Sequence, residues 1–143
     1  NKLVETILGN YLEIAEESGR KGDYNTLGVQ AAILGKYSQA ETAFKQSLSI
    51  DRNSISPQVN LGNVYFALER YQQAIQTYHA VEEFLVERGR ADSSTHLSVL
   101  LLISKAYYAL ENFEKAAEYY KRIVEKDPDM AEGNSYLGNS DGQ

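Results

Sequence analysis

The stretch that decides the fold is Tyr71-Gln72-Gln73-Ala74-Ile75-Gln76-Thr77-Tyr78, and its pattern occurs twice more in the chain. Both Tyr37-Ser38-Gln39-Ala40-Glu41-Thr42-Ala43-Phe44 and Phe113-Glu114-Lys115-Ala116-Ala117-Glu118-Tyr119-Tyr120 also read aromatic, two residues, alanine, three residues, aromatic. Apolar residues three or four positions apart indicate helix rather than strand. The alanine in each copy indicates a close crossing of two helices, since a larger side chain would force their axes apart. Copies in phase predict a helical repeat protein.

A second marker lies ten residues before the leading aromatic of each copy, as Leu27-Gly28, Leu61-Gly62 and Ile103-Ser104. Together the markers resemble the tetratricopeptide repeat, a helix-turn-helix unit of about 34 residues. The resemblance covers residues 21–130. It implies an all-α solenoid that coils as a right-handed superhelix, with three full repeats and flanking partial repeats. Ser104 departs from the glycine of the pattern but keeps the small size.

The repeat phase predicts the organisation of the chain. Residues 1–20 form an amphipathic helix, which we interpret as a degenerate repeat or cap; a linker helix to another domain is the alternative. The full repeats span residues 21–54, 55–96 and 97–130. Residues 131–143 begin a truncated fourth repeat, marked by Leu137-Gly138.

The second repeat is longer than the first. Ala40 and Ala74 are 34 residues apart, but Ala74 and Ala116 are 42 apart. We expect both helices around the insertion to be longer by about a turn, with Gly89 ending one and Ser93, Ser94 or Thr95 capping the next. The long interval resembles the extended repeats of kinesin light chains, and a tolerated loop insertion is the alternative.

Composition excludes several classes of protein. The 143 residues suit one domain, and the absence of cysteine excludes disulfides, zinc–thiolate sites, iron–sulfur clusters and a cysteine nucleophile. The net charge of −6 argues against nucleic acid and anionic membranes as partners. The longest apolar run, Val99–Ile103, is far shorter than the ~20 residues of a membrane span, so we expect no membrane insertion.

The beginning of the chain suggests a fragment. It lacks an initiator methionine, and an acid stands at Glu5 where a signal peptide would be apolar. We therefore expect a longer parent protein. The location in the cell stays unknown, with the cytoplasm as the default.

Few residues suggest chemistry. His79 precedes Glu82 and Glu83 at helical spacing, which permits a weak metal site but occurs often by chance, so a solvated helical face is the favoured interpretation. His96 stands at a predicted helix start, where a capping role is favoured over a catalytic one. Neither histidine fits a nucleophile–base–acid triad, and no glycine-rich phosphate loop occurs. We predict no enzyme activity, no cofactor and no metal.

The remaining candidate is a binding surface. The family resemblance implies that the first helix of each pair lines a concave groove, which binds a peptide or partner protein. Asparagine can hydrogen-bond a peptide backbone through both donor and acceptor, and aromatic side chains can anchor a partner. Each residue could instead only pack against a neighbouring helix. The candidate binding residues flank the core positions of these helices: Asn25, Val29, Asn60, Asn63, Phe66, Leu101, Lys105 and Tyr108.

One subclass of the family is not expected. Carboxylate-clamp repeats hold acidic chaperone tails with Lys, Asn, Asn, Lys and Arg, but only Asn60 matches among the slots Asn25, Val29, Asn60, Ser98 and Leu102. Without the cations, a terminal carboxylate loses its charge-assisted partners. We predict a non-enzymatic protein–protein interaction scaffold or adaptor. Self-association as a homo-oligomer, or a regulatory module of an enzyme-containing parent, are the alternatives.

Overall fold

The computed structural model describes residues 1–132, which form helices and turns and no strand. The all-α prediction is therefore confirmed over this range, and the predicted Leu137-Gly138 marker lies outside it. The chain divides into two compact units, which we call unit 1 (Asn1–Glu69) and unit 2 (from Arg70 onward). The helices are α1 (Lys2–Ser18), α2 (Lys21–Ile33), α3 (Tyr37–Ile50), α4 (Ile55–Ala67), α5 (Tyr71–Glu87), α6 (Ser94–Ala109), α7 (Phe113–Lys126) and α8 (Pro128–Glu132).

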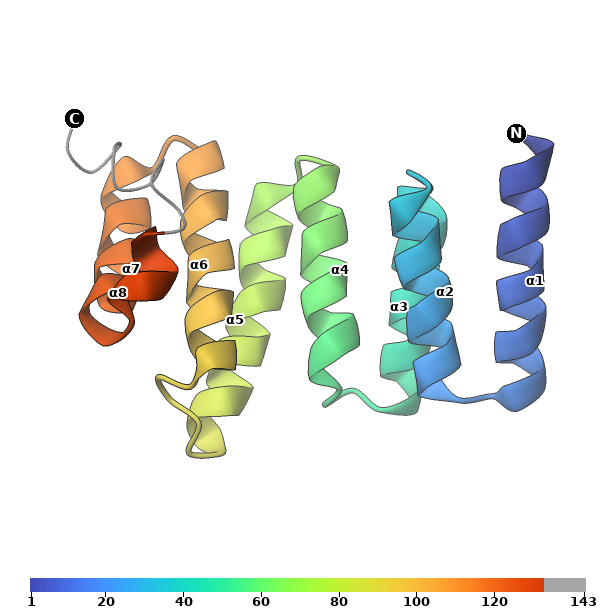
Figure 1. Ribbon diagram of the computed structural model, residues 1–143, viewed down its shortest axis with the longest axis horizontal. Coiled ribbons are helices and arrows are strands. Elements are labelled where there is room, and N and C mark those ends of the chain that lie inside the picture. The colour runs from blue at the N-terminus through green and yellow to red at the C-terminus, as the bar shows by residue number, and fades with distance from the viewer. Residues whose placement is uncertain (133–143) are drawn as a thin grey trace. The chain divides into compact units, whose positions relative to one another are not determined.

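Unit 1 contains α1 to α4, which alternate in direction (Figure 1). Helix α2 packs against α1 and α3, and α4 packs against α3 and α2. The crossing of α2 and α3 depends on Gly28, because a Cβ atom there would lie 2.4 Å from the buried Phe44 ring. Ala40 is fully buried on α3. The small and aromatic slots of the sequence pattern thus meet at one crossing.

Helix α1 is the predicted N-terminal amphipathic helix. The Asn1 side chain caps it by accepting hydrogen bonds from the backbone N–H groups of Leu3 and Val4. Leu8 and Ala15 are buried, whereas Ile14 is 53% exposed. Unit 1 therefore buries only part of the apolar surface of α1.

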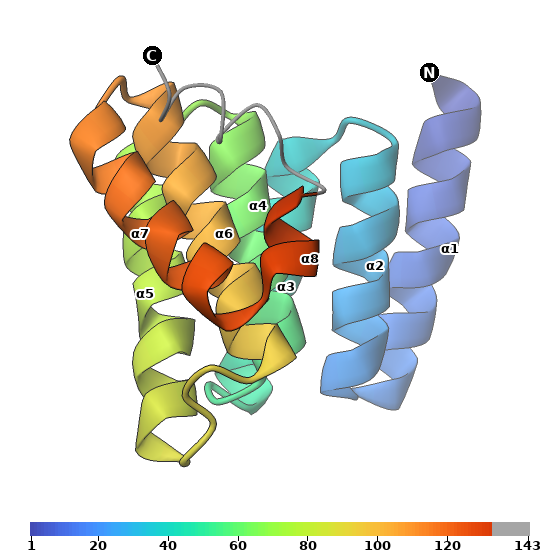
Figure 2. The same ribbon diagram turned by 60° about the vertical axis from the view of Figure 1, so that its left-hand side comes forward.

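Unit 2 contains α5 to α8. Helices α5, α6 and α7 alternate in direction (Figure 2), and α6 packs against both others. Tyr78, Leu100 and Ile123 are among its fully buried side chains. Ser104 is also buried, and its hydroxyl donates a 2.7 Å hydrogen bond to the carbonyl oxygen of Ala116 on α7. Serine thus fills the glycine slot of this repeat and adds a polar link.

The long interval of the sequence lengthens both helices beside it. Helix α5 has 17 residues and α6 has 16, against 14 in α3 and 13 in α4. The difference is about one turn each, as predicted. Gly89 lies in the left-handed region with φ of 73°. Ser93 is the N-cap of α6 and accepts from the His96 N–H.

Two turns between paired helices have the same backbone. After α2, the N–H groups of Gly35 and Lys36 donate to the carbonyl oxygens of Ala32 and Ala31 at 3.0 and 2.8 Å. This is the Schellman motif, whose left-handed residue is Gly35 with φ of 75°. After α6, Glu111 occupies the same place with φ of 61°. The hydrogen bonds of this turn therefore hold a non-glycine residue in the left-handed region.

Candidate functional site

Unit 1 brings together the predicted binding residues of α2 and α4. The Asn60 amide donates through Nδ2 to Asn25 Oδ1 at 3.1 Å, and the Asn25 amide donates through Nδ2 to Ser56 Oγ at 3.3 Å. These bonds join the two helices and fix the orientation of both amides. Within the described residues, no hydrogen bond engages the Asn60 carbonyl oxygen Oδ1, so it remains an acceptor for a ligand.

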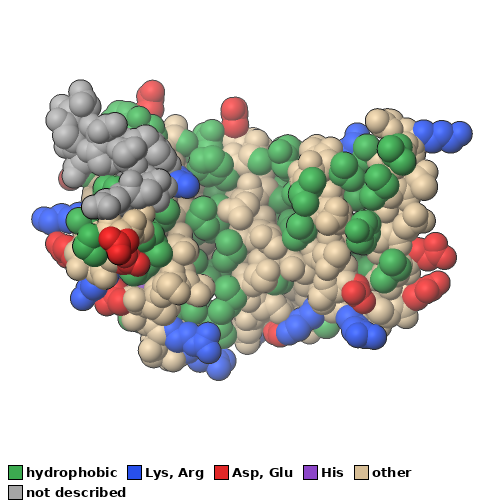
Figure 3. Space-filling model, viewed as in Figure 1, with side chains coloured by type: hydrophobic (Ala, Val, Ile, Leu, Met, Phe, Trp, Pro, Cys, Tyr) green, Lys and Arg blue, Asp and Glu red, His purple; other side chains and the backbone are tan. Residues whose placement is uncertain are grey.

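A hollow of about 260 Å³ lies beside these amides, and we call it the α2–α4 hollow. Val29, Asn60 and Asn63 form part of its wall, as the sequence analysis expected of binding residues. The remaining lining residues are Ala32, Ile33, Tyr37, Phe44 and Val64. None of these residues carries a charge, and in Figure 3 the blue and red side chains over α2 and α4 lie mainly near the helix ends. The hollow therefore suits a neutral ligand.

Two residues differ from the predicted set in unit 1. Phe66 is half-buried on α4 and does not line the hollow. Ile33 also flanks the core positions of α2 but was left out of the candidate binding set; it does line the hollow and is 70% exposed. Its place agrees with its spacing, because Ile33 follows Val29 by four positions and so shares its helical face.

Unit 2 carries the other three predicted binding residues on α6. Leu101, Lys105 and Tyr108 are spaced by four and three residues, so they share one face of the helix, and all are half-buried. The Tyr108 ring meets the Phe113 ring edge-on at 5.3 Å between centroids. Phe113 is 50% exposed at the start of α7 and extends this apolar surface beyond the predicted residues.

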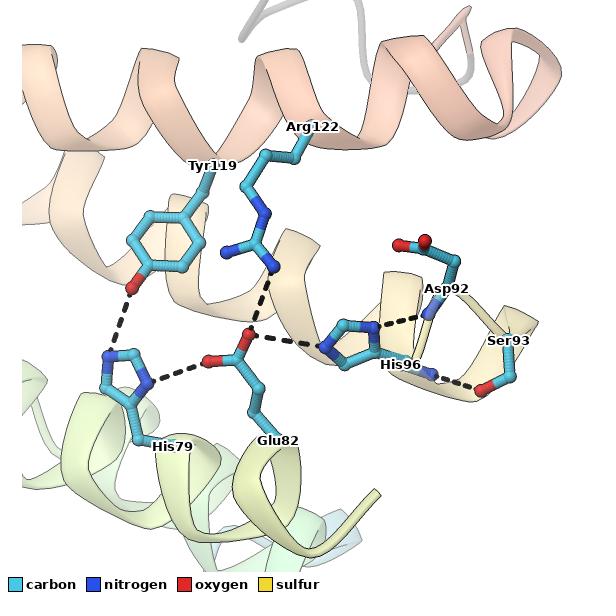
Figure 4. A network of polar contacts seen from close by, with 7 residues as sticks. All are labelled: His79, Glu82, Asp92, Ser93, His96, Tyr119 and Arg122. Atoms are coloured by element: carbon cyan, nitrogen blue, oxygen red, sulfur yellow. Dashed lines mark hydrogen bonds and ion pairs between the residues drawn. The ribbon is translucent and has the colours of Figure 1, made fainter. Parts of the chain in front are cut away.

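A polar network in unit 2 was not predicted from the sequence (Figure 4). Its centre is the Glu82 carboxylate on α5. Oε1 lies 3.0 Å from His79 Nδ1, and Oε2 lies 3.2 Å from His96 Nε2 on α6 and 3.5 Å from an Arg122 nitrogen on α7. Tyr119 Oη on α7 lies 3.3 Å from His79 Nε2. One carboxylate thus links three helices.

The hydrogen bonds of the network indicate where its protons lie. The Asp92 backbone N–H donates to His96 Nδ1 at 2.8 Å, so the proton of the neutral ring is on Nε2 and points to Glu82. Burial, and then the nearby Glu82 carboxylate, raise the pKa of the Tyr119 hydroxyl. A protonated Tyr119 can donate to His79 Nε2, which leaves the Nδ1 proton of His79 for Glu82. Every ring nitrogen then has a partner.

These contacts change the interpretation of both histidines. His96 lies near the N-cap of α6, as predicted. Its side chain is only 1% exposed, so the ring is part of the core. His79 was expected on a solvated face, yet both of its ring nitrogens lie within 3.3 Å of protein partners. Among the residues the structure describes, no group of three His, Cys, Asp or Glu could hold a metal ion. We therefore interpret the network as a structural link.

Sequence profiles of the tetratricopeptide repeat match residues 53–128 and 24–54. The longer match alone covers more than half of the chain. The chain belongs to the tetratricopeptide repeat family. The shorter match covers most of α2 and all of α3, and the longer match covers α4 to α7. The family assignment from the sequence is therefore confirmed.

Several solved structures have a similar fold. MamA from Desulfovibrio magneticus RS-1, taken from residue 41 to its end, is 26% identical, with a TM-score of 0.76 over 96% of this chain and 73% of that one. The first repeat domain of Spaghetti (RPAP3), bound to an HSP90 peptide, is 18% identical, with a TM-score of 0.71 over 87% of this chain and 95% of that one. The N-terminal domain of stress-induced protein-1 from C. elegans is also 18% identical, with a TM-score of 0.70 over 82% and 94%.

Two further searches found nothing, one among curated proteins and one among the described helices of this chain. No curated protein matches the sequence. Within residues 1–132, no helix of this repeat protein combines the length and the apolar composition that a membrane span requires.

Proposed function

We propose that this chain is a non-enzymatic interaction module, and that the α2–α4 hollow binds an extended peptide segment of a partner protein. The observation that carries the proposal is the neutral hollow with the Asn25–Asn60 amide pair at its edge. A peptide-recognition surface combines apolar contact area with a few fixed polar groups. Val29 and Ile33 supply the apolar contact area, and Asn60 and Asn63 supply the polar groups.

The lining residues favour a particular kind of peptide. An apolar side chain fits against Val29 and Ile33, while Asn60 Oδ1 accepts from a peptide N–H. The RPAP3 domain is bound to the HSP90 peptide SRMEEVD, whose end is acidic. This chain has Val29 and Leu102 at two of the slots where carboxylate-clamp repeats have polar or cationic side chains. We therefore propose a neutral, apolar segment rather than an acidic tail.

The α6 surface of unit 2 is proposed as a second contact. Leu101 and Tyr108 offer apolar area next to Phe113, and Lys105 offers a charge between them. Aromatic side chains on a partly exposed surface are frequent sources of binding energy.

The absence of catalysis is also part of the proposal, and the His96 geometry supports it. Its Nδ1 accepts from Asp92 and its Nε2 faces Glu82, while the side chain is almost fully buried. A general base must reach the proton that it removes from a substrate. His96 has neither an available nitrogen nor an open path.

Selection of phage-displayed random peptides against the whole chain tests the proposal. A selected peptide, carrying a fluorophore, is titrated with the protein and followed by anisotropy. We expect Asn60→Leu to weaken binding about tenfold or more, or ~1.4 kcal/mol, because it removes the amide while keeping the size. The changes Phe66→Ala on α4 of unit 1 and Tyr108→Ala on α6 of unit 2 test the candidate surface of each unit; made together, we expect them to weaken binding at least tenfold as well. Glu118→Ala, an exposed change on α7, is the matched control and should leave binding unchanged.

Equal binding by the native chain and Asn60→Leu would show that the α2–α4 hollow is not the site. Thermal melting of each variant separates loss of binding from loss of fold. Sedimentation of the native chain tests self-association: a dimer that Asn60→Leu converts to a monomer would replace peptide binding by homo-oligomer formation.

A further inference from the structure

A second, larger groove lies on unit 1 and shares no residue with the α2–α4 hollow. It has a volume of about 680 Å³, runs between α1 and α3, and has Leu27 of α2 at its base; we call it the α1–α3 groove. Leu27 and Ala43 are buried beneath it, so the base is apolar. The volume is within the range of about 300–1,000 Å³ that is usual for ligand pockets.

The α1 wall of this groove has acids at its two ends and leucines between them. Glu5, Leu8, Leu12 and Glu16 follow one another by three, four and four residues and so share one helical face. At 1.5 Å per residue, the two acids are about 16 Å apart along the helix axis. The α3 wall is polar but uncharged, with Ser38, Gln39, Thr42 and Gln46.

The charges around the groove therefore favour a positively charged occupant. Glu5 and Glu16 are exposed, and no lysine or arginine is among the described residues that line the groove. The whole chain also carries a net charge of −6. Complementary charges steer association and fix the register of a bound segment.

Gly9 gives a second reason to expect an occupant. It lies in the middle of the 17-residue α1, it is exposed, and it lines the groove. A glycine there costs up to about 1 kcal/mol relative to alanine. A Cβ atom at Gly28 would clash with Phe44, but a Cβ atom at Gly9 would meet nothing within 4 Å. Packing inside unit 1 thus does not require Gly9, whereas close approach of another backbone would.

We propose that the α1–α3 groove binds an amphipathic helix of a partner protein, with apolar side chains over Leu8 and Leu12 and cations beside Glu5 and Glu16. A helix is favoured over an extended strand because the groove walls are helices and offer no sheet edge to pair with. A helix satisfies its own backbone hydrogen bonds. The two cations are about eleven residues, or three turns, apart on the partner.

A synthetic helix tests this assignment directly. The probe is a labelled peptide of about 18 residues, or five turns, built from alanine with leucines along one face and two lysines eleven positions apart. A matched peptide has glutamate in place of both lysines. Fluorescence anisotropy with the whole chain should show binding of the lysine peptide, and at least tenfold weaker binding of the glutamate peptide. Added salt should weaken the lysine peptide, since exposed charges are screened.

Three variants of the protein test whether the lysine peptide binds in the α1–α3 groove. Gly9→Leu should weaken the lysine peptide at least tenfold by filling the groove, while the free protein melts no lower than the native chain. Gly22→Leu is the matched control on α2, since a Cβ atom there also meets nothing within 4 Å and Gly22 does not line the groove. It should bind the lysine peptide as the native chain does. The double change Glu5→Gln and Glu16→Gln should remove the preference for lysine over glutamate.

Several results would overturn the proposal. Unchanged binding by Gly9→Leu would place the peptide elsewhere. Equal loss of binding with Asn60→Leu would assign it to the α2–α4 hollow. A native dimer that Gly9→Leu converts to a monomer would make a second copy of this chain, and not a partner helix, the occupant.

Discussion

Units 1 and 2 both contain a tetratricopeptide helix pair, but they fill the same crossing in different ways. In unit 1, Gly28 leaves room for the Phe44 ring, which would lie 2.4 Å from a Cβ atom at that position. In unit 2, Ser104 occupies the equivalent slot and its hydroxyl bonds to the Ala116 carbonyl oxygen. The slot thus requires a small residue, and the neighbours decide whether a polar atom can be added.

The two units also differ in where their polar groups lie. Unit 1 places the Asn60 and Asn63 amides on the wall of a neutral hollow. Unit 2 gathers Glu82, His79 and His96 between its helices, where they bond to one another. The same repeat therefore offers polar residues at a surface in one place and uses them for cohesion in another.

The largest effect is expected from exchanging the residues at the crossing. Gly28→Ser should lower the free energy of unfolding by up to about 3 kcal/mol, because its Cβ overpacks against Phe44. Gly22→Ser on the same helix, where a Cβ atom meets nothing within 4 Å, should stay within about 0.5 kcal/mol. Denaturant titration measures both. Similar values for the two variants would mean that the crossing tolerates serine equally in both units.

Removing the centre of the unit 2 network should have the next largest effect. Glu82→Leu leaves the buried His96 without its acceptor, and we expect a loss of about 2 kcal/mol. The exposed neighbour Glu83→Leu should change stability by less than about 0.5 kcal/mol. Hydrogen exchange resolved along the chain should show faster exchange in α5 and α6 for Glu82→Leu. If exchange rises only in unit 1, the network does not hold unit 2 together.

The N-cap of α6 should contribute less than the network. Ser93→Ala removes the oxygen that accepts the His96 N–H, and we expect a loss of about 1 kcal/mol. Ser94→Ala, one residue into the helix, should change stability by only a few tenths of a kcal/mol. Thermal melts of the pair test which serine is the cap. A larger loss of stability for Ser94→Ala than for Ser93→Ala would show that Ser94, and not Ser93, is the N-cap.

The smallest effect concerns alkaline pH. The raised pKa of Tyr119 means that the folded chain holds this proton more tightly than the unfolded chain. Its contribution to stability is complete below the unfolded pKa of about 10, and it is lost as pH rises through the folded pKa. Tyr119→Phe should therefore make the alkaline decline of the unfolding free energy shallower. Urea titrations at neutral and alkaline pH measure this, and an unchanged slope would contradict it.

The fold was predictable because its key residues recur along the sequence. The polar network of unit 2 was not predictable because its residues do not recur. Ala40, Ala74 and Ala116 recur at one place in the pattern, and all three are buried. Glu82 and His96 are 14 residues apart across a turn, and no periodicity in the sequence relates them. Their contact depends on how the longer α5 and α6 end, which the sequence indicated only to within a turn.

The lining of the candidate site was predictable where it follows the repeat phase. Val29, Asn60 and Asn63 were chosen because they flank core positions, and they do line the α2–α4 hollow. Ile33 flanks a core position in the same way but was left out of the candidate set, and Phe113 was interpreted as one of the recurring aromatic positions of the repeat. Whether such a residue is buried depends on which neighbour covers it, and the pattern does not say.

The left-handed turns have a consequence for engineering. Glu69 and Glu111 both have φ of 61°, in a region where side chains other than glycine and asparagine are strained by roughly 1 kcal/mol. Asparagine or glycine at these two positions would relieve that strain at the turns that follow α4 and α6. Substitutions at these two turns would therefore raise the stability of the chain without changing a side chain on its helices.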